Sequence, residues 1–128
     1  MINTPTEAQM AIIPKLYETE HITAEDKIVH CHFFIGGCHW FIVEFDQGDT
    51  MFGFCILNSD FLNSEWGYVS LEELKQINIK GIFQVQFNIN WVHTPAGEVG
   101  LIRKGGGILS DPRDEANGGQ WKWHTLQN

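Results

Sequence analysis

Long apolar runs, clustered cations and a cysteine framework are all absent from the 128 residues of this chain. No apolar stretch is long enough to span a bilayer, so we expect no membrane segment. Residues 1–5 lack the basic and apolar regions of a secretory signal peptide. The three cysteines are few and odd in number, which favours a reducing compartment over a secreted disulfide scaffold. We therefore expect a cytoplasmic protein.

Positive charge is scarce and unevenly distributed. Eight Lys and Arg residues stand against 16 Asp and Glu residues, for a net charge of −8. Residues 1–75 carry twelve acidic and three basic residues, a net charge of −9, whereas residues 76–128 carry four acidic and five basic residues, a net charge of +1. Proteins that bind the phosphate backbone of nucleic acids need clustered Lys and Arg residues. The sequence has no such cluster, so we expect no direct binding of nucleic acid. The acidic half suits a basic protein partner, and it equally serves as a solvated surface.

The residues that are present favour a folded sheet. Hydrophobic residues make up 43% of the chain and charged residues 19%, as in ordinary globular proteins. Nine Phe, five Trp and two Tyr favour pleated, half-buried surfaces. We predict one domain over residues 1–128, with a helical N-terminal segment (1–27), a sheet core (28–93) and a loop-rich C-terminal extension (94–128).

Capping residues and alternation give the order of the elements. Thr4 as cap, Pro5 at the first position and Glu7 at the third predict an N-terminal helix. Ser70 and Glu73 form a second capping box, which predicts a short helix between the fourth and fifth strands. The predicted fold class is α+β, with an antiparallel sheet of about five strands in meander hairpins at residues 28–35, 38–46, 51–58, 66–69 and 82–91.

The last strand has the clearest alternation, with Phe83 through Trp91 placing every second, apolar side chain on one face. After it we predict a short strand at residues 99–102, flexible glycines at 105–107, and Trp121 and Trp123 in a final strand or packed on the sheet. Residues 103–107 lack the Lys-Ser/Thr pair and the following helix of a phosphate-binding loop, so we expect none.

Gly36 and Gly37 predict a tight hairpin turn, which fixes the register of the two flanking strands. In this register, one face of the hairpin is apolar except for Glu44, and we assign it to the core. Its cross-strand pairs are Ile35 with Cys38, Phe33 with Trp40, Cys31 with Ile42, and Val29 with Glu44. The other face carries histidines and aromatics, and we expect it to be only partly covered. Cys31 and Cys38 lie roughly 13 Å apart along the strands, too far for a disulfide.

His30, His32 and His39 are the candidate metal ligands. Only His32 and His39 approach each other, as a diagonal cross-strand pair, and the nearby cysteines fall on the opposite face. A functional metal generally has three or four convergent ligands, so we expect no metal and no other cofactor.

Glu44 is a carboxylate that the register points inward, which is costly unless it is paired. It is a candidate proton-transfer group with a raised pKa, but we favour a structural role at a backbone amide or at solvent. Glu65, Trp66 and Tyr68 follow a polar loop and can line a partner-binding groove. The alternative is that Trp66 and Tyr68 pack at the edge of the core.

The chain resembles a family catalogued as domain of unknown function 2958. The resemblance rests on Trp40-Phe41-Ile42-Val43-Glu44, on Phe52-Gly53-Phe54 and, most specifically, on the run from Glu65-Trp66-Gly67-Tyr68 through Ser70-Leu71-Glu72-Glu73-Leu74. A lysine common in relatives is replaced in the His30-Cys31-His32 region. The resemblance implies a bacterial protein, often borne on plasmids, phages or conjugative elements, without an established activity.

Three functional hypotheses follow. The first is a non-enzymatic accessory module of a mobile element that binds a host or mobile-element protein through Glu44, Glu65, Trp66 and Tyr68. The second is a small hydrolase-like enzyme that uses Glu44 or Glu65 with a nearby histidine as general base. The third is a metal-binding domain built on the three candidate histidines.

Overall fold

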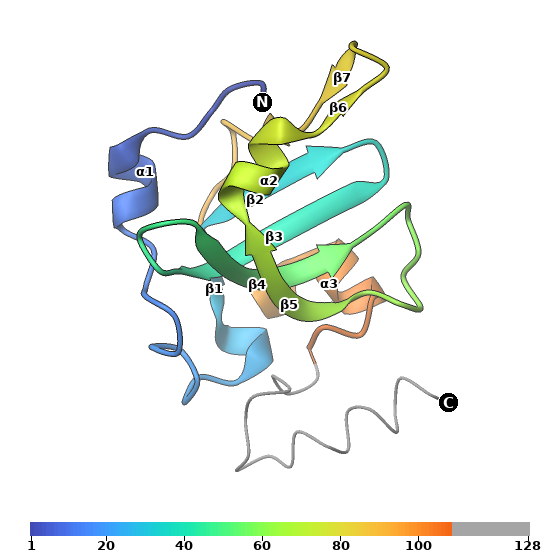
Figure 1. Ribbon diagram of the computed structural model, residues 1–128. Coiled ribbons are helices and arrows are strands. Elements are labelled where there is room, and N and C mark those ends of the chain that lie inside the picture. Colours follow the sequence, from blue (N-terminus) through green and yellow to red (C-terminus); the bar gives the residue numbers. More distant parts are fainter. Residues whose placement is uncertain (109–128) are drawn as a thin grey trace.

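A five-stranded antiparallel sheet organises the computed structural model, which describes residues 1–108 (Figure 1). This sheet and the short helices around it confirm the α+β prediction. The two tryptophans at 121 and 123 lie outside the described residues. The strand order is β5-β4-β3-β2-β8, with β2 at Cys31–Ile35, β3 at Cys38–Phe45, β4 at Thr50–Ile56, β5 at Glu65–Ser70 and β8 at Gln86–Phe87.

The β2–β3 hairpin has the predicted register near its turn. Gly36 has a φ of 54°, and Ile35 pairs with Cys38 while Cys31 pairs with Ile42. All three cysteines are free thiols, which confirms the prediction of no disulfide between Cys31 and Cys38.

The predicted pairing of Val29 with Glu44 is wrong. Strand β1 (Ile28–Val29) pairs instead with β9 (Thr94–Pro95), which places Val29 opposite Thr94. In addition, the β3–β4 register shifts between Ile42 and Glu44. This bulge adds one residue to β3, so the side chains beyond it change faces. Glu44 therefore lies opposite Phe52, on the face away from Trp40.

Each face of the sheet carries its own hydrophobic core. The first core lies under α1 (Glu7–Ala11) and α2 (Leu71–Gln76), and its buried side chains include Met10, Phe33, Trp40, Ile42, Phe45, Met51, Leu71 and Leu74. The second core lies under η1 (Ala24–Asp26), η2 (Ala96–Glu98) and α3 (Gly100–Lys104), and includes Val29, Phe41, Val43, Phe52, Phe54, Trp66, Val99 and Ile102. Figure 1 shows α2 in front of the sheet and α3 behind it.

The second core bears on three predictions. The face expected to be only partly covered is half-buried at His30, Phe34 and His39. It is fully covered at Phe41 and Val43, where residues 94–108 contribute to the second core. The predicted strand at 99–102 is instead the N-cap and first turn of α3, and Val99, the N-cap residue, and Ile102 are both buried in the second core. Two of the glycines predicted to be flexible, Gly105 and Gly107, are packed against Phe54. A Cβ on Gly107 would lie 2.7 Å from the Phe54 ring, and the Trp66 indole donates to the Gly107 carbonyl at 2.9 Å.

An N-cap was predicted for each of the two helices, but α1 begins two residues later than predicted. Thr6, not Thr4, is the N-cap of α1, and it forms a capping box with Gln9. Ser70 caps α2 by accepting a hydrogen bond from the Glu73 amide, as predicted.

The predicted long strand at 82–91 is divided. Strands β6 (Asn78–Ile79) and β7 (Phe83–Gln84) form a separate hairpin that projects from the top of Figure 1. Only β8 joins the main sheet. Asn88 ends it, because its side chain accepts the Asn90 amide and its carbonyl accepts the Trp91 amide in a turn. As a result Phe83 and Ile89 are exposed instead of facing the core.

Candidate functional site

The four predicted partner-binding residues lie on both faces of the sheet, and the bulge in β3 determines the face of Glu44. Glu44 lies opposite Phe52, and Phe52 lies opposite Tyr68, so the three form one cross-strand row on the second-core face. Trp66 shares this face but is only 3% exposed, which makes it part of the core. Glu65 pairs with Cys55 on the other face. Burial, followed by the Glu65 charge, raises the pKa of the Cys55 thiol to about 12.

Glu44 is fully buried and holds the segment that crosses over it. Its carboxylate accepts the backbone N–H of Tyr17 at 2.8 Å, the N–H of Thr19 at 3.2 Å, and the Thr19 hydroxyl. The Lys27 ammonium, also fully buried, donates to the Thr19 carbonyl and, at 3.2 Å, to the same hydroxyl. We call Glu44, Thr19 and Lys27 the buried polar network. Two opposite charges thus meet at one hydroxyl, where each offsets the desolvation cost of the other.

The buried polar network places Tyr17 at the surface. The Tyr17 backbone has a φ of 70°, a region that non-glycine residues rarely adopt. Its side chain is 53% exposed, and its hydroxyl accepts a hydrogen bond from the Tyr68 hydroxyl at 2.9 Å. Tyr68 is 48% exposed and packs on Phe52, with ring centroids 5.1 Å apart. We call Tyr17 and Tyr68 the tyrosine pair.

Sequence analysis did not select Tyr17 as a site residue, and the structure places its side chain at the surface. Leu16, its neighbour, packs against the second core instead. A left-handed backbone at a tyrosine has no signature in a single sequence, so no signal could have identified Tyr17 as a surface residue.

The candidate metal ligands form two separate imidazole pairs. His32 and His39 form the predicted diagonal pair, with 2.9 Å between His32 Nε2 and His39 Nδ1. His32 Nδ1 lies 3.1 Å from the side-chain nitrogen of Asn88. His30 pairs instead with His93, a residue the sequence did not suggest, at 2.8 Å between the two Nδ1 atoms. Within residues 1–108 no three carboxylate, imidazole or thiol groups converge as metal ligands.

Burial favours the uncharged forms of His30 and His32. Burial, and then the neighbouring His39, lowers the pKa of His32 to about 4. Burial, and then His93, lowers the pKa of His30 to about 4 as well. The His32 and His39 rings stack on Phe41 of the second core, with 4.6 Å between the centroids of His32 and Phe41. This arrangement is that of neutral rings packed into a sheet face.

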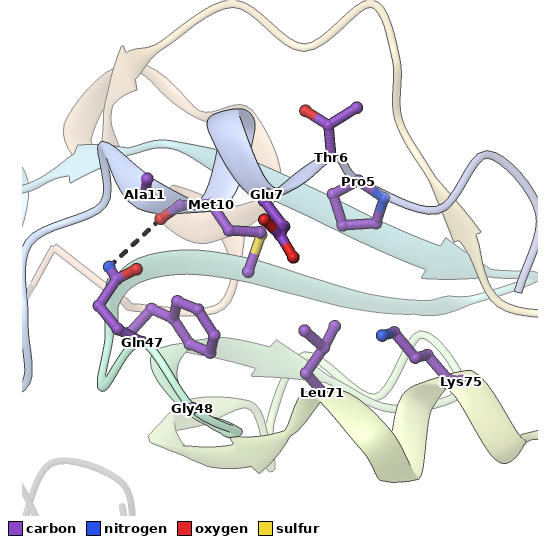
Figure 2. A pocket seen from close by; sticks show the side chains of 10 residues that line it. Pro5, Thr6, Glu7, Met10, Ala11, Gln47, Gly48, Leu71 and Lys75 are labelled. Carbon is purple, nitrogen blue, oxygen red and sulfur yellow. Dashed lines mark hydrogen bonds between the residues drawn. The ribbon is translucent and has the colours of Figure 1, made fainter.

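A groove lies between α1 and α2, over the first core (Figure 2). It has a volume of about 470 Å³. Its lining comes from α1 and the residues before it, from the β3–β4 turn, and from α2: Pro5, Thr6, Glu7, Met10, Ala11, Phe45, Gln47, Gly48, Leu71 and Lys75. These residues come from three separate parts of the chain and meet only through the tertiary fold, so no sequence motif predicts a site here.

The fold and these sites define a small α+β domain with a bulged antiparallel sheet and polar groups buried on one of its faces. The chain belongs to the family described as protein of unknown function (DUF2958), whose model matches residues 4–95. That range includes the buried polar network and the tyrosine pair but ends before η2 and α3. No curated protein and no solved structure matched the chain. Among residues 1–108, no helix combines the length and apolar character needed to cross a bilayer.

Proposed function

We propose that this protein is a non-enzymatic binding module whose contact surface is centred on the tyrosine pair. The observation that carries the proposal is a 2.9 Å hydrogen bond that joins the two half-exposed phenol groups. The buried Glu44 fixes the backbone of one of them, Tyr17, by accepting its N–H. Exposed aromatic rings held in one arrangement lose little conformational entropy on binding. Aromatic side chains of this kind dominate the energetics of protein interfaces.

The chemistry around the tyrosine pair favours a basic partner. Glu18 and Glu20 are exposed in the same turn as Tyr17. Arginine and lysine side chains bind the faces of aromatic rings through cation–π interactions, and carboxylates nearby steer them to the site. The net charge of −8 adds to this attraction. The partner that we propose is therefore a protein with a basic segment, encoded by the host or by a mobile element.

The enzyme hypothesis finds less support in this geometry. Glu44 has no exposed surface and lies beneath the segment that contains Tyr17 and Thr19, so a substrate reaches it only if that segment moves. Glu65 lies on the other face of the sheet. The metal hypothesis stays a prediction, and elemental analysis of the untagged protein tests it.

A peptide library tests the proposed function directly. Each basic peptide is paired with a copy in which Gln replaces Arg, and binding is measured to the wild-type protein and to Y68A and Y17A variants. We expect selective binding of Arg peptides, with a loss of roughly tenfold or more in each tyrosine variant. Phe83→Ala, which removes an exposed ring from the β6–β7 hairpin, is the matched control. Equal binding of both peptide sets, or equal losses in the control, contradicts the proposal.

A further inference from the structure

The groove between α1 and α2 has fixed walls, because one turn holds both helices. Gln47 donates to the carbonyls of Met10, at 3.3 Å, and Ile13, at 3.0 Å, at the end of α1. Two residues further on, the Asp49 carbonyl accepts the Leu71 amide at 2.9 Å, and its carboxylate accepts the Glu72 amide at 2.7 Å at the start of α2. The separation of the helices is therefore set before any ligand arrives, as in most small-molecule sites.

The turn itself is held by its own side chain. One oxygen of the Asp46 carboxylate accepts the amides of Gly48, Asp49 and Thr50 at 2.7–3.0 Å. These backbone hydrogen bonds lower the pKa of Asp46, so the turn keeps its charge-assisted bonds at neutral pH.

The lining of the groove combines an apolar floor with two opposite charges. Met10, Phe45 and Leu71 are buried side chains of the first core. Glu7 projects from α1 and Lys75 from α2, toward the space between the helices (Figure 2). Within residues 1–108 neither charged group makes a hydrogen bond or an ion pair, and both are exposed at the rim.

We propose that this groove binds a small zwitterion with an apolar side chain. The ammonium of the ligand pairs with Glu7, its carboxylate pairs with Lys75, and its side chain covers Met10 and Leu71. A volume of about 470 Å³ fits a ligand of this size. A free amino acid and a short peptide share this chemistry. The site lies on the first-core face, away from the tyrosine pair, and does not depend on the proposed function.

Titration of the full chain, followed by nuclear magnetic resonance, tests the inference with free leucine, leucyl-leucine and N-acetyl-leucine amide. We expect saturable shifts at Met10 and Leu71 with at least one zwitterion, and the stronger zwitterion identifies the source of the ligand. Glycine is expected to bind more weakly than leucine, since it leaves the apolar floor uncovered. Equal binding of the blocked amide, or no shifts with either zwitterion at millimolar concentration, overturns the proposal.

Charge variants separate the site from general effects on the protein. Glu7→Gln and Lys75→Gln should each weaken binding about fivefold, in the range of exposed ion pairs. Glu73→Gln and Lys80→Gln remove exposed charges that do not line the groove and should leave binding unchanged. Glu7→Lys should nearly abolish binding, and the double variant E7K/K75E should restore it with the ligand reversed. Failure of the double variant to regain binding, while it remains folded, contradicts the charge assignment.

Discussion

The two faces of the sheet are built on different principles. The first core is a cluster of apolar side chains under α1 and α2. The buried polar and charged residues of the described chain all lie on the side of the second core: Thr19, Lys27, His32, Glu44 and Ser64. His32 stacks on Phe41, Ser64 donates to the Gly105 carbonyl, and Glu44 lies opposite Phe52.

This difference separates two tasks. Apolar packing supplies stability and tolerates exchange between side chains of similar volume. Buried hydrogen bonds contribute less net stability but specify one arrangement, because a group that loses its partner is costly. The second face therefore fixes the segment that carries Tyr17, whereas the first face provides a preformed groove.

The largest effect is expected from Glu44→Gln. The amide keeps the shape of the carboxylate but removes its charge, which leaves the Lys27 ammonium beside a neutral group at the Thr19 hydroxyl. We expect the free energy of unfolding to fall by about 3–5 kcal/mol, measured by urea denaturation. Glu65→Gln is the matched control, since that carboxylate is exposed on the other face, and it should change stability by less than about 0.5 kcal/mol. Equal effects in the two variants break the comparison between the faces.

A pH titration of stability should show the buried imidazoles. Because the folded protein holds the pKa of His32 near 4, below its ordinary value of about 6.5, the unfolded chain binds more protons between these values. The contribution of the neutral His32 ring to the free energy of unfolding is therefore fully present above about pH 6.5. It is lost as the pH drops toward 4, by about 3 kcal/mol for His32 alone. His32→Phe should reduce the decrease in melting temperature that thermal melts show between pH 7 and pH 4. An unchanged decrease in that variant contradicts the assignment of a neutral, buried ring.

Gly53→Ala tests the bulge that moves Glu44 to the second face. A Cβ at Gly53 would lie 2.1 Å from the Phe41 carbonyl oxygen, so the strands must separate. We expect a loss of about 1–3 kcal/mol in the free energy of unfolding, typical of overpacking. Gly67, directly opposite on β5, has nothing within 4 Å of its Cβ position, so Gly67→Ala is the control and should be nearly neutral. The comparison fails if both variants behave alike.

The smallest effect is expected in the first core. Leu74 is buried there, and Leu74→Met keeps its volume and its helix propensity. We expect a loss below about 1.5 kcal/mol by urea denaturation, less than for the neutral swap at Glu44. A larger loss at Leu74 than at Glu44 reverses the contrast between the faces.

What the sequence predicted depended on local signals. The glycine pair gave the hairpin register from Ile35 to Ile42, because a two-residue turn leaves one pairing. The bulge beyond Ile42 has no such signal, so Glu44 was placed on the wrong face although its burial was anticipated. Alternation at 82–91 predicted the burial of Val85 and Phe87 but not the exposure of Phe83 and Ile89, because only β8 pairs with β2 and β7 pairs with β6.

The two proposed surfaces depend on tertiary contacts that leave no local signal in the sequence. Tyr68 was named from its position after a loop, but its partner Tyr17 depends on a backbone conformation that the sequence does not encode locally. The groove was missed because its two charged residues, Glu7 and Lys75, meet only when α1 and α2 are anchored to the same turn.

Amide hydrogen exchange at Tyr17 and Thr19 tests the central claim most directly, that a buried carboxylate on the second face fixes the backbone of the proposed contact surface. Both amides donate to Glu44, so we expect them to be strongly protected in the wild-type protein and to exchange rapidly in the Glu44→Gln variant. Rapid exchange of both amides in the folded wild-type protein would contradict that claim.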